Sequence, residues 1–174
     1  MKKLTTYISH VKDLHSLNEY LNERLIVNKK YINNKIIVKS LKELKSIIKD
    51  RSIDPNTKKF NNNIDLSDID VSKLDDLSET FLWYNFETID ISGWDTSNVK
   101  NMRQMFFGCE QLTDIIGIED MNIDNCEDMS YMFADCAKLD ISDKIKEWEI
   151  DPRIVSAKFM FNDSLTEFKF TRKY

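Results

Sequence analysis

The sequence contains little glycine, proline, cysteine or histidine. Its 174 residues include 3 Gly, 2 Pro, 3 Cys and 2 His. So few glycines exclude the glycine-rich loops that bind phosphates and dinucleotides, and the scarcity of both glycine and proline excludes collagen-like and linker-type chains. No run of about 18 apolar residues is present, so we expect no membrane span.

The start of the chain is basic, at Lys2 and Lys3, but it lacks the apolar run of about 7–15 residues and the small-residue cleavage site of a secretory signal peptide. The cysteines, Cys109, Cys126 and Cys136, are an odd number without a close pair, which is typical of a reducing compartment. We therefore expect a cytoplasmic protein without a secretion signal.

Charge is distributed unevenly along the chain. Residues 1–59 carry 14 Lys or Arg against 6 Asp or Glu, a net charge of +8, and residues 60–174 carry 11 against 24, a net charge of −13. This asymmetry indicates two functional parts. The basic part lacks the interleaved aromatic platforms of nucleic-acid-binding proteins, so we do not expect direct nucleic-acid binding.

Residues 1–35 are expected to form an amphipathic docking helix and a linker. Apolar side chains recur every three or four residues over 4–25, a spacing that places them in one stripe along a helix. A docking helix would bind a partner through this stripe. The predicted partner-binding residues are Tyr7, Val11, Leu14, Leu17 and Leu21.

Residues 36–63 are expected to form an N-terminal cap made of a strand, a helix and a loop. Residues 36–38 are a short β-type run, and Ser40 followed by Glu43 is a capping box, the usual start of a helix. We expect the helix to run from this cap to about Arg51 and residues 52–63 to form the loop.

Residues 64–174 contain a repeated motif. Residues 94–106 read WDTSNVKNMRQMF, residues 121–133 read MNIDNCEDMSYMF, residues 69–81 read IDVSKLDDLSETF, and a degenerate copy spans 148–161. The closing phenylalanines are 25, 27 and 28 residues apart, and a near-constant period in this range is typical of stacked repeats.

Alternating apolar residues predict strands over 89–91, 116–118 and 168–170, and three- and four-residue spacing predicts helical turns over 99–106 and 126–133. Each repeat is thus expected to be strand, turn and short helix. Like residues of neighbouring repeats would then form interior rows. The expected core residues are Phe81, Trp94, Val99, Met102, Met105, Phe106, Cys109, Cys126, Met129, Met132, Phe133, Cys136, Trp148 and Phe161.

The copy at 94–109, with its Trp-Asp-Thr-Ser-Asn-Val core, its Met-x-x-Met-Phe and its following Cys, resembles the leucine-rich repeats of the BspA-like bacterial family. The resemblance implies an α/β solenoid of about four to five rungs over residues 64–174, with a degenerate C-terminal cap. Many members of that family are exported surface proteins. Short, unexported versions with a leading helix occur in gut bacteria and their phages.

The sequence offers no catalytic or metal-binding arrangement. His10 and His15 are five residues apart, about 140° around a helix, so they cannot bind one ion together. The aspartates over 65–76 lack the Gly and Glu of a calcium loop, and we expect Asp95 to hydrogen-bond its local backbone. We predict no enzyme activity, no cofactor, no metal and no small-molecule substrate.

Three aromatic residues near the closing phenylalanines, Trp83, Tyr84 and Phe107, are expected to face solvent and to contact a partner. The leading hypothesis is a non-enzymatic protein-interaction module of a structural or assembly-associated kind, a phage virion protein included, located in the host cytoplasm or the virion. The alternative is a cytoplasmic inhibitor or adaptor whose acidic half covers a basic surface of a host protein. A surface-repeat fragment with a lectin-like role is a third possibility.

Overall fold

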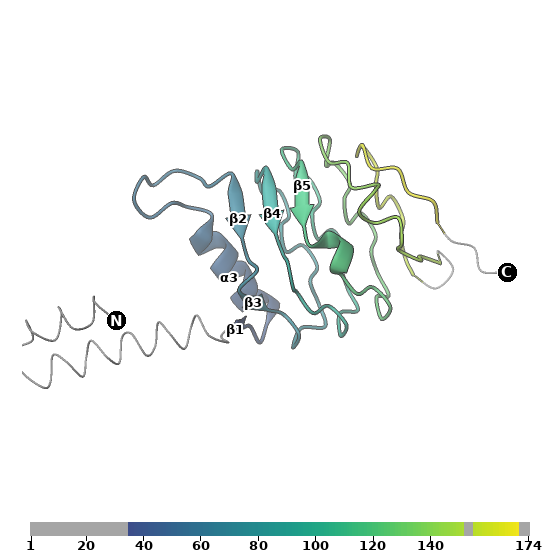
Figure 1. The fold of residues 1–174 in the computed structure, drawn as a ribbon, viewed down its shortest axis with the longest axis horizontal. Helices are drawn as coiled ribbons and strands as arrows, with labels where there is room; N and C mark the ends of the chain where they lie inside the picture. The colour runs from purple at the N-terminus through teal and green to yellow at the C-terminus, as the bar shows by residue number, and fades with distance from the viewer. Residues whose placement is uncertain (1–34, 152–154, 171–174) are drawn as a thin grey trace, which may run out of the picture. The chain divides into compact units, whose positions relative to one another are not determined.

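The computed structural model describes residues 35–151 and 155–170. The chain divides into two compact units, Met1–Lys35 and Ile36–Tyr174. The first lies, apart from Lys35, outside the described residues, and so do the proposed docking residues Tyr7, Val11, Leu14, Leu17 and Leu21. The second contains β1 (Ile36–Ile37), α3 (Leu41–Arg51), β2 (Asn63–Asp65), β3 (Ile69–Asp70), β4 (Thr88–Asp90), β5 (Asp114–Ile116) and the 3-10 helix η1 (Ile118–Asp120) (Figure 1).

Helix α3 begins at the predicted cap. Ser40 Oγ accepts the backbone N–H of Glu43 (3.2 Å), and the Glu43 carboxylate accepts that of Lys39 (2.9 Å). These two bonds satisfy N–H groups that have no partner inside a helix. Leu44 and Ile48 are fully buried and join the core. The predicted helix over 40–51 is confirmed.

The strands form two parallel sheets. β1 pairs with β3, and β2, β4 and β5 form a three-stranded sheet in that order. In the second sheet Ile64, Ile89 and Ile115 lie in register, and all three side chains are buried. The expected strands over 36–38 and 89–91 are therefore confirmed in outline.

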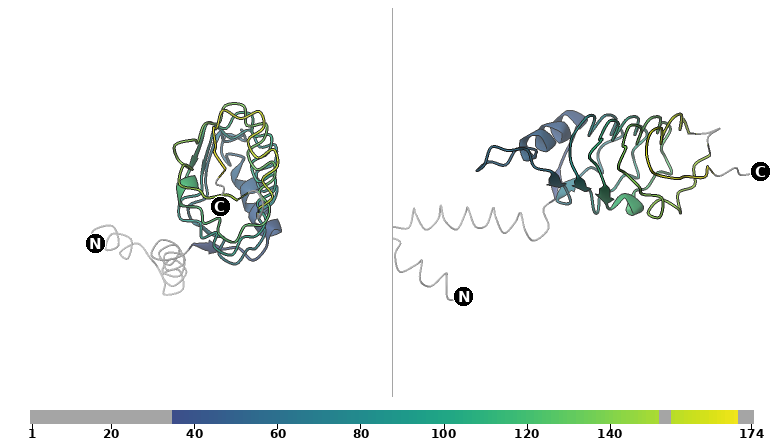
Figure 2. Two further views of the ribbon diagram at one scale, coloured as in Figure 1. Left: turned by 90° about the vertical axis from the view of Figure 1, so that its right-hand side faces the viewer. Right: turned by 90° about the horizontal axis from the view of Figure 1, so that it is seen from above.

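Opposite the sheet, four parallel stretches of turns, here called the turn segments, cover 76–83, 101–108, 128–135 and 156–163. Single parallel bridges join Asp76, Asn101, Asp128 and Ser156 in sequence. In each of the first three segments, every second backbone N–H donates to a carbonyl of the next segment, as Phe81 does to Met105 (2.8 Å) and Phe106 to Met132 (2.9 Å). From α3 the chain passes through these stacked loops to residues 155–170 (Figure 2).

One continuous apolar core lies between the sheet and the turn segments. The rings of Phe81, Phe106, Phe133 and Phe161 stack in that order, with neighbouring centroids 5.1–5.4 Å apart and nearly parallel planes. Phe161 is half-buried, and the other expected core residues are buried.

The expectation of a solenoid of four to five rungs is wrong. The described residues contain one α-helix and two parallel sheets of two and three short strands. Residues 99–106 and 126–133 contain no helix, residues 168–170 contain no strand, and β5 ends at Ile116, shortly before η1. The described part is mixed α/β with little regular structure.

The physical reason lies in the use of the backbone hydrogen bonds. In residues 99–106 the N–H groups of Met102, Gln104 and Phe106 donate to the neighbouring turn segment instead of to carbonyls four residues earlier, as an α-helix requires. Gln104 also has a φ of 54°, in the left-handed region that interrupts a right-handed helix. The helix-like spacing of apolar residues in this segment therefore marks the side chains that are buried in the core and does not indicate a helix.

Candidate protein-interaction surface

A row of aromatic side chains crosses the four turn segments. Trp83 contacts Phe107 edge to face (5.1 Å between ring centroids), Phe107 contacts Tyr131 (6.3 Å), and Tyr131 contacts Phe159 (5.3 Å). Trp83 is 57% exposed and Phe159 60% exposed, and the two inner rings are partly exposed. We call these four residues the aromatic row. Large aromatic side chains in a continuous exposed patch are typical of binding surfaces.

Trp83 lies closely against the backbone of Gly108. A Cβ atom added at Gly108 would lie 2.2 Å from Cε3 and 2.5 Å from Cζ3 of the indole. The backbone N–H of Trp83 donates to the Phe107 carbonyl (2.9 Å). The indole therefore packs on the Gly108 backbone, although more than half of Trp83 is exposed.

Three members of the aromatic row have left-handed backbone conformations. The φ angles are 61° at Trp83, 58° at Tyr131 and 54° at Phe159. For a bulky side chain this conformation costs about 1–2 kcal/mol relative to the right-handed region. The corresponding positions are left-handed also where they carry the polar residues Glu79, Gln104, Asp135 and Asp163, so the conformation belongs to the repeat and is not specific to the aromatic residues.

The members of the aromatic row do not occupy one repeat position. In the hydrogen-bond pattern, Trp83 corresponds to Gly108 and Asp135, and Tyr131 and Phe159 correspond to Gln104. Phe107 lies one residue before Gly108. The exposed rings are thus contributed by three different positions, unlike the buried phenylalanines, which share one.

The structure separates the three aromatic residues that the sequence singled out. Trp83 and Phe107 are in contact, whereas Tyr84 stacks on buried Phe86 (5.0 Å), which stacks in turn on Phe60 (5.1 Å). Burial raises the pKa of Tyr84. Tyr84 therefore belongs to a second aromatic group and not to the aromatic row.

Sequence reasoning missed Tyr131 and Phe159. The signal was present, because each stands where the earlier repeats have the polar residues Glu79 and Gln104. An aromatic residue that replaces a polar one at an outward-facing repeat position indicates an exposed patch.

The three thiols are buried and hydrogen-bonded. Cys109 Sγ donates to the Phe81 carbonyl and Cys136 Sγ to the Phe106 carbonyl, both at 3.0 Å. Burial raises the pKa of Cys136 to about 12 and that of Cys126 to about 11, and shifts the pKa of Cys109 in the same direction. All three cysteines are free, and they lack the low pKa of a reactive thiol.

Many aspartates of the acidic half cap turns. Asp95 Oδ1 accepts the backbone N–H of Ser97 (3.1 Å) and its hydroxyl (2.6 Å), so the expected local hydrogen bond of Asp95 is confirmed. The same Asp-x-Ser bond recurs at Asp65, Asp70, Asp76, Asp90, Asp128 and Asp140. In residues 35–151 and 155–170 no group of three or more His, Cys, Asp or Glu is placed to hold a metal ion.

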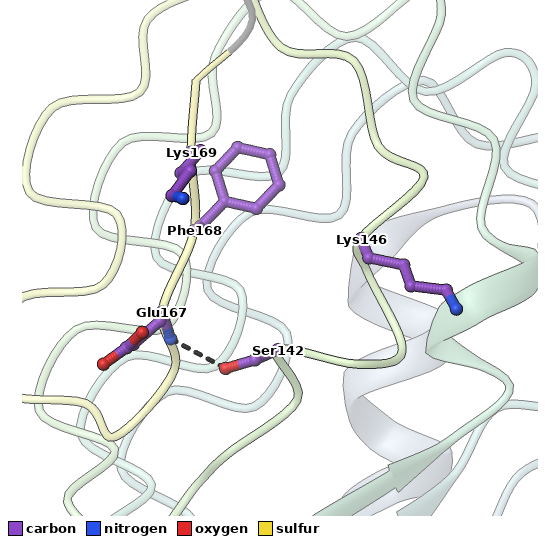
Figure 3. A pocket seen from close by; sticks show the side chains of 5 residues that line it. All are labelled: Ser142, Lys146, Glu167, Phe168 and Lys169. Atoms are coloured by element: carbon purple, nitrogen blue, oxygen red, sulfur yellow. Dashed lines mark hydrogen bonds between the residues drawn. The ribbon is translucent and has the colours of Figure 1, made fainter.

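A pocket of about 540 Å³ lies between residues 142–146 and 167–169. Ser142 Oγ accepts the backbone N–H of Glu167 there (2.8 Å), and the Phe168 ring projects toward the segment that carries Lys146 (Figure 3). The lining combines Lys146 and Lys169 with Glu167.

Among the described residues no helix is long and apolar enough to cross a membrane. A family model described as "Mycoplasma protein of unknown function, DUF285" matches residues 40–172. The chain belongs to this family, and the match is consistent with the resemblance to BspA-like repeat proteins. No curated protein and no solved structure matches the chain.

Proposed function

We propose that this protein is a non-enzymatic protein-interaction module that binds its partner through the aromatic row. The observation that carries the proposal is the placement of Trp83, which is 57% exposed, has a left-handed backbone and rests on Gly108. An ordered, exposed tryptophan loses little side-chain entropy on binding and offers a large apolar area, as binding hot spots do.

The arrangement of the aromatic row supports binding over packing. Interior packing in this protein repeats one residue type at one position, as the stacked phenylalanines do. The aromatic row instead collects exposed rings from three repeat positions. A partner that covers this surface would bury the rings and remove their apolar area from water.

The charge of the protein supports a partner with a basic surface. Residues 60–174 have a net charge of −13. Asp135 and Asp163 lie in the same turn segments as Tyr131 and Phe159 of the aromatic row, four residues after each. Opposite charges steer two proteins together and suppress wrong partners. This favours, as a second candidate, an inhibitor or adaptor that covers a basic surface of a host protein.

The biological setting is proposed from the BspA-like resemblance. We propose that the repeats are of the Trp-Asp-Thr-Ser-Asn-Val type and that the module acts in a structural or assembly-associated complex, a phage virion included, or in the host cytoplasm. The docking helix over residues 4–25 remains a prediction that lies outside the described residues.

The test compares the proteins retained by the tagged full chain with those retained by three variants. Trp83→Ala and Phe159→Ala each remove one exposed ring of the aromatic row. Ile37→Ala is the matched control, because Ile37 is 53% exposed and lies on β1, outside the aromatic row. Partners are identified by mass spectrometry, and the affinity of each is then measured by calorimetry.

A partner that binds the wild type and Ile37→Ala but binds Trp83→Ala and Phe159→Ala at least about tenfold more weakly supports the proposal; truncating a hot-spot residue typically costs that much or more. Equal affinity of all four proteins for every partner would assign binding to another surface.

A further inference from the structure

The last turn segment, residues 156–163, has a row of backbone donors without an acceptor in the described part of the chain. In each of the first three segments, four alternate N–H groups donate to carbonyls of the next segment, as Met129, Tyr131, Phe133 and Asp135 do in the third. The corresponding N–H groups of the fourth belong to Ala157, Phe159, Phe161 and Asp163. None of these four has an acceptor among the residues that the structure describes. We call them the open donor row.

The open donor row presents donors alone. The carbonyls of Ala157, Phe159 and Phe161 accept turn bonds from residues three positions later, at 3.2–3.4 Å. The alternate carbonyls, such as those of Ser156 and Lys158, accept N–H groups of the third segment. Two copies of this row cannot pair face to face, because neither would supply an acceptor. A binding partner must bring a row of carbonyls.

Exposed apolar side chains occur within the last turn segment and in the residues that follow it. Phe159 and Leu165 are each 60% exposed and Phe170 is 40% exposed. At the other end of the unit, α3 buries Leu44 and Ile48 in the core (Figure 1). In the described part no helix covers residues 156–163, which form the last of the stacked segments (Figure 2). Unpaired backbone groups beside exposed apolar side chains are a template for pairing with another chain.

The chain itself shows which segment fits such a row. The donors of residues 101–108 are covered by residues 128–135, which supply the carbonyls of Asp128, Ser130, Met132 and Ala134 at 2.8–3.0 Å. The covering segment also brings a phenylalanine, Phe133, onto the ring stack (5.4 Å from Phe106). At the fourth segment Phe168 provides a ring next to Phe161, tilted by 34°. Phe168 covers that ring but leaves the four donors unpaired.

We propose that the open donor row binds a segment of a second polypeptide that carries the same Asp/Asn-Met-x-x-Met-Phe pattern and adds in parallel as the next turn segment. The incoming carbonyls accept the N–H groups of Ala157, Phe159, Phe161 and Asp163, and the incoming phenylalanine replaces Phe168 on the ring stack. Main-chain hydrogen bonds provide affinity, and the methionine and phenylalanine positions provide selectivity. This surface shares Phe159 with the aromatic row but does not include Trp83.

The experiment uses the wild-type full chain and a peptide with the sequence of residues 127–135, which contains all four acceptor carbonyls of the third segment. Amide exchange of the ¹⁵N-labelled protein is followed by NMR. Before peptide is added, the four amides of the open donor row should exchange at least about tenfold faster than those of Met129, Tyr131, Phe133 and Asp135, since one ordinary hydrogen bond separates the two sets.

Saturating peptide should slow the four open amides by about tenfold or more and shift the ring signals of Phe168. A control peptide with both methionines and the phenylalanine replaced by serine should do neither. Trp83→Ala should bind the peptide like the wild type, so that failure of this proposal and failure of the proposed function are distinguishable. The proposal is overturned if the four amides are already protected in the free protein, if both peptides act equally, or if the native peptide binds without slowing these amides.

Discussion

The indole of Trp83 occupies the space that a side chain at Gly108 would need: an added Cβ would lie 2.2 Å from its Cε3. Glycine at 108 is not required by backbone conformation alone, because Asp135 and Asp163 stand at corresponding positions with φ angles of 58° and 53°. The contact with Trp83 accounts for the glycine. An exposed side chain is thus coupled to the backbone of the next repeat.

We therefore predict that Gly108→Ala displaces the indole and weakens partner binding as much as Trp83→Ala does. The free energy of unfolding should fall by about 1–3 kcal/mol, from the left-handed backbone and the overpacked contact. Gly93→Ala is the control for the backbone contribution, since Gly93 has the same φ of 71°. In the double variant with Trp83→Ala the clash is absent, so the two losses should not add; additive losses in urea unfolding would contradict the contact.

The second prediction separates the two contributions to binding. With a partner in hand, the association rate should fall as salt rises, because the acidic half steers a basic partner over a distance that salt screens. Neutralising Asp135 and Asp163 with asparagine should lower the association rate and its salt dependence. Trp83→Ala should mainly raise the dissociation rate. Surface plasmon resonance at low and high ionic strength measures both rates; charge variants that change only the dissociation rate would contradict steering.

Local signals in the sequence predicted helix α3 well and the secondary structure of the repeats poorly. The Ser40 cap and the apolar spacing after it define α3, because in a short helix these local interactions agree with the tertiary packing of Leu44 and Ile48. In the repeats the same three- and four-residue spacing marks buried residues of a non-helical segment. Its backbone bonds go to residues about 25 positions away, a partner choice that local periodicity does not encode.

For a related reason, the sequence predicted only part of the aromatic row. Trp83 and Phe107 stand beside the closing phenylalanines, so their exposure followed from the limited room inside. Tyr84 follows Trp83 directly, but it stacks on Phe86. The direction of an aromatic side chain in these turns depends on the backbone φ angles, such as the left-handed φ of Trp83. The sequence pattern does not specify these angles.

The third prediction compares two tryptophans at corresponding repeat positions. Trp94 Nε1 donates to the Leu66 carbonyl (2.9 Å), whereas buried Trp148 Nε1 has no hydrogen-bond partner among residues 35–151 and 155–170. Trp94→Phe should lose a hydrogen bond and leave that carbonyl with one partner fewer, lowering the free energy of unfolding by about 1–3 kcal/mol including the packing loss.

Trp148→Phe removes a buried donor that has no partner in the described part of the chain. The gain from removing it offsets part of the packing loss, so the loss of stability should be smaller than that of Trp94→Phe by about 1 kcal/mol or more. Urea unfolding of the two variants and the wild type measures the difference. Equal losses would show that the Trp94 hydrogen bond contributes nothing to stability.

The last prediction concerns the thiols and alkaline pH. An unfolded thiol ionises near about pH 8.5, whereas burial keeps Cys126 protonated in the folded protein to about pH 11 and Cys136 to about pH 12. Above pH 8.5 the unfolded state therefore binds fewer protons than the folded state, and the free energy of unfolding must fall as the pH rises. The stabilisation is complete below pH 8.5 and is lost progressively toward pH 11–12.

Each buried thiol should contribute a slope that approaches about 1.4 kcal/mol per pH unit. Cys136→Ala should remove one such slope between pH 8 and 10, a range that lies below most tyrosine ionisation. At pH 7 the same substitution should lower the free energy of unfolding by about 1–2 kcal/mol, through the lost packing and the lost bond to the Phe106 carbonyl. Urea unfolding of both proteins at several pH values measures the slopes. An unchanged slope would contradict the role of Cys136 as a buried, protonated thiol. A native disulfide or stoichiometric zinc in the purified protein would also contradict it, because a disulfide requires an oxidised sulfur and zinc requires a thiolate.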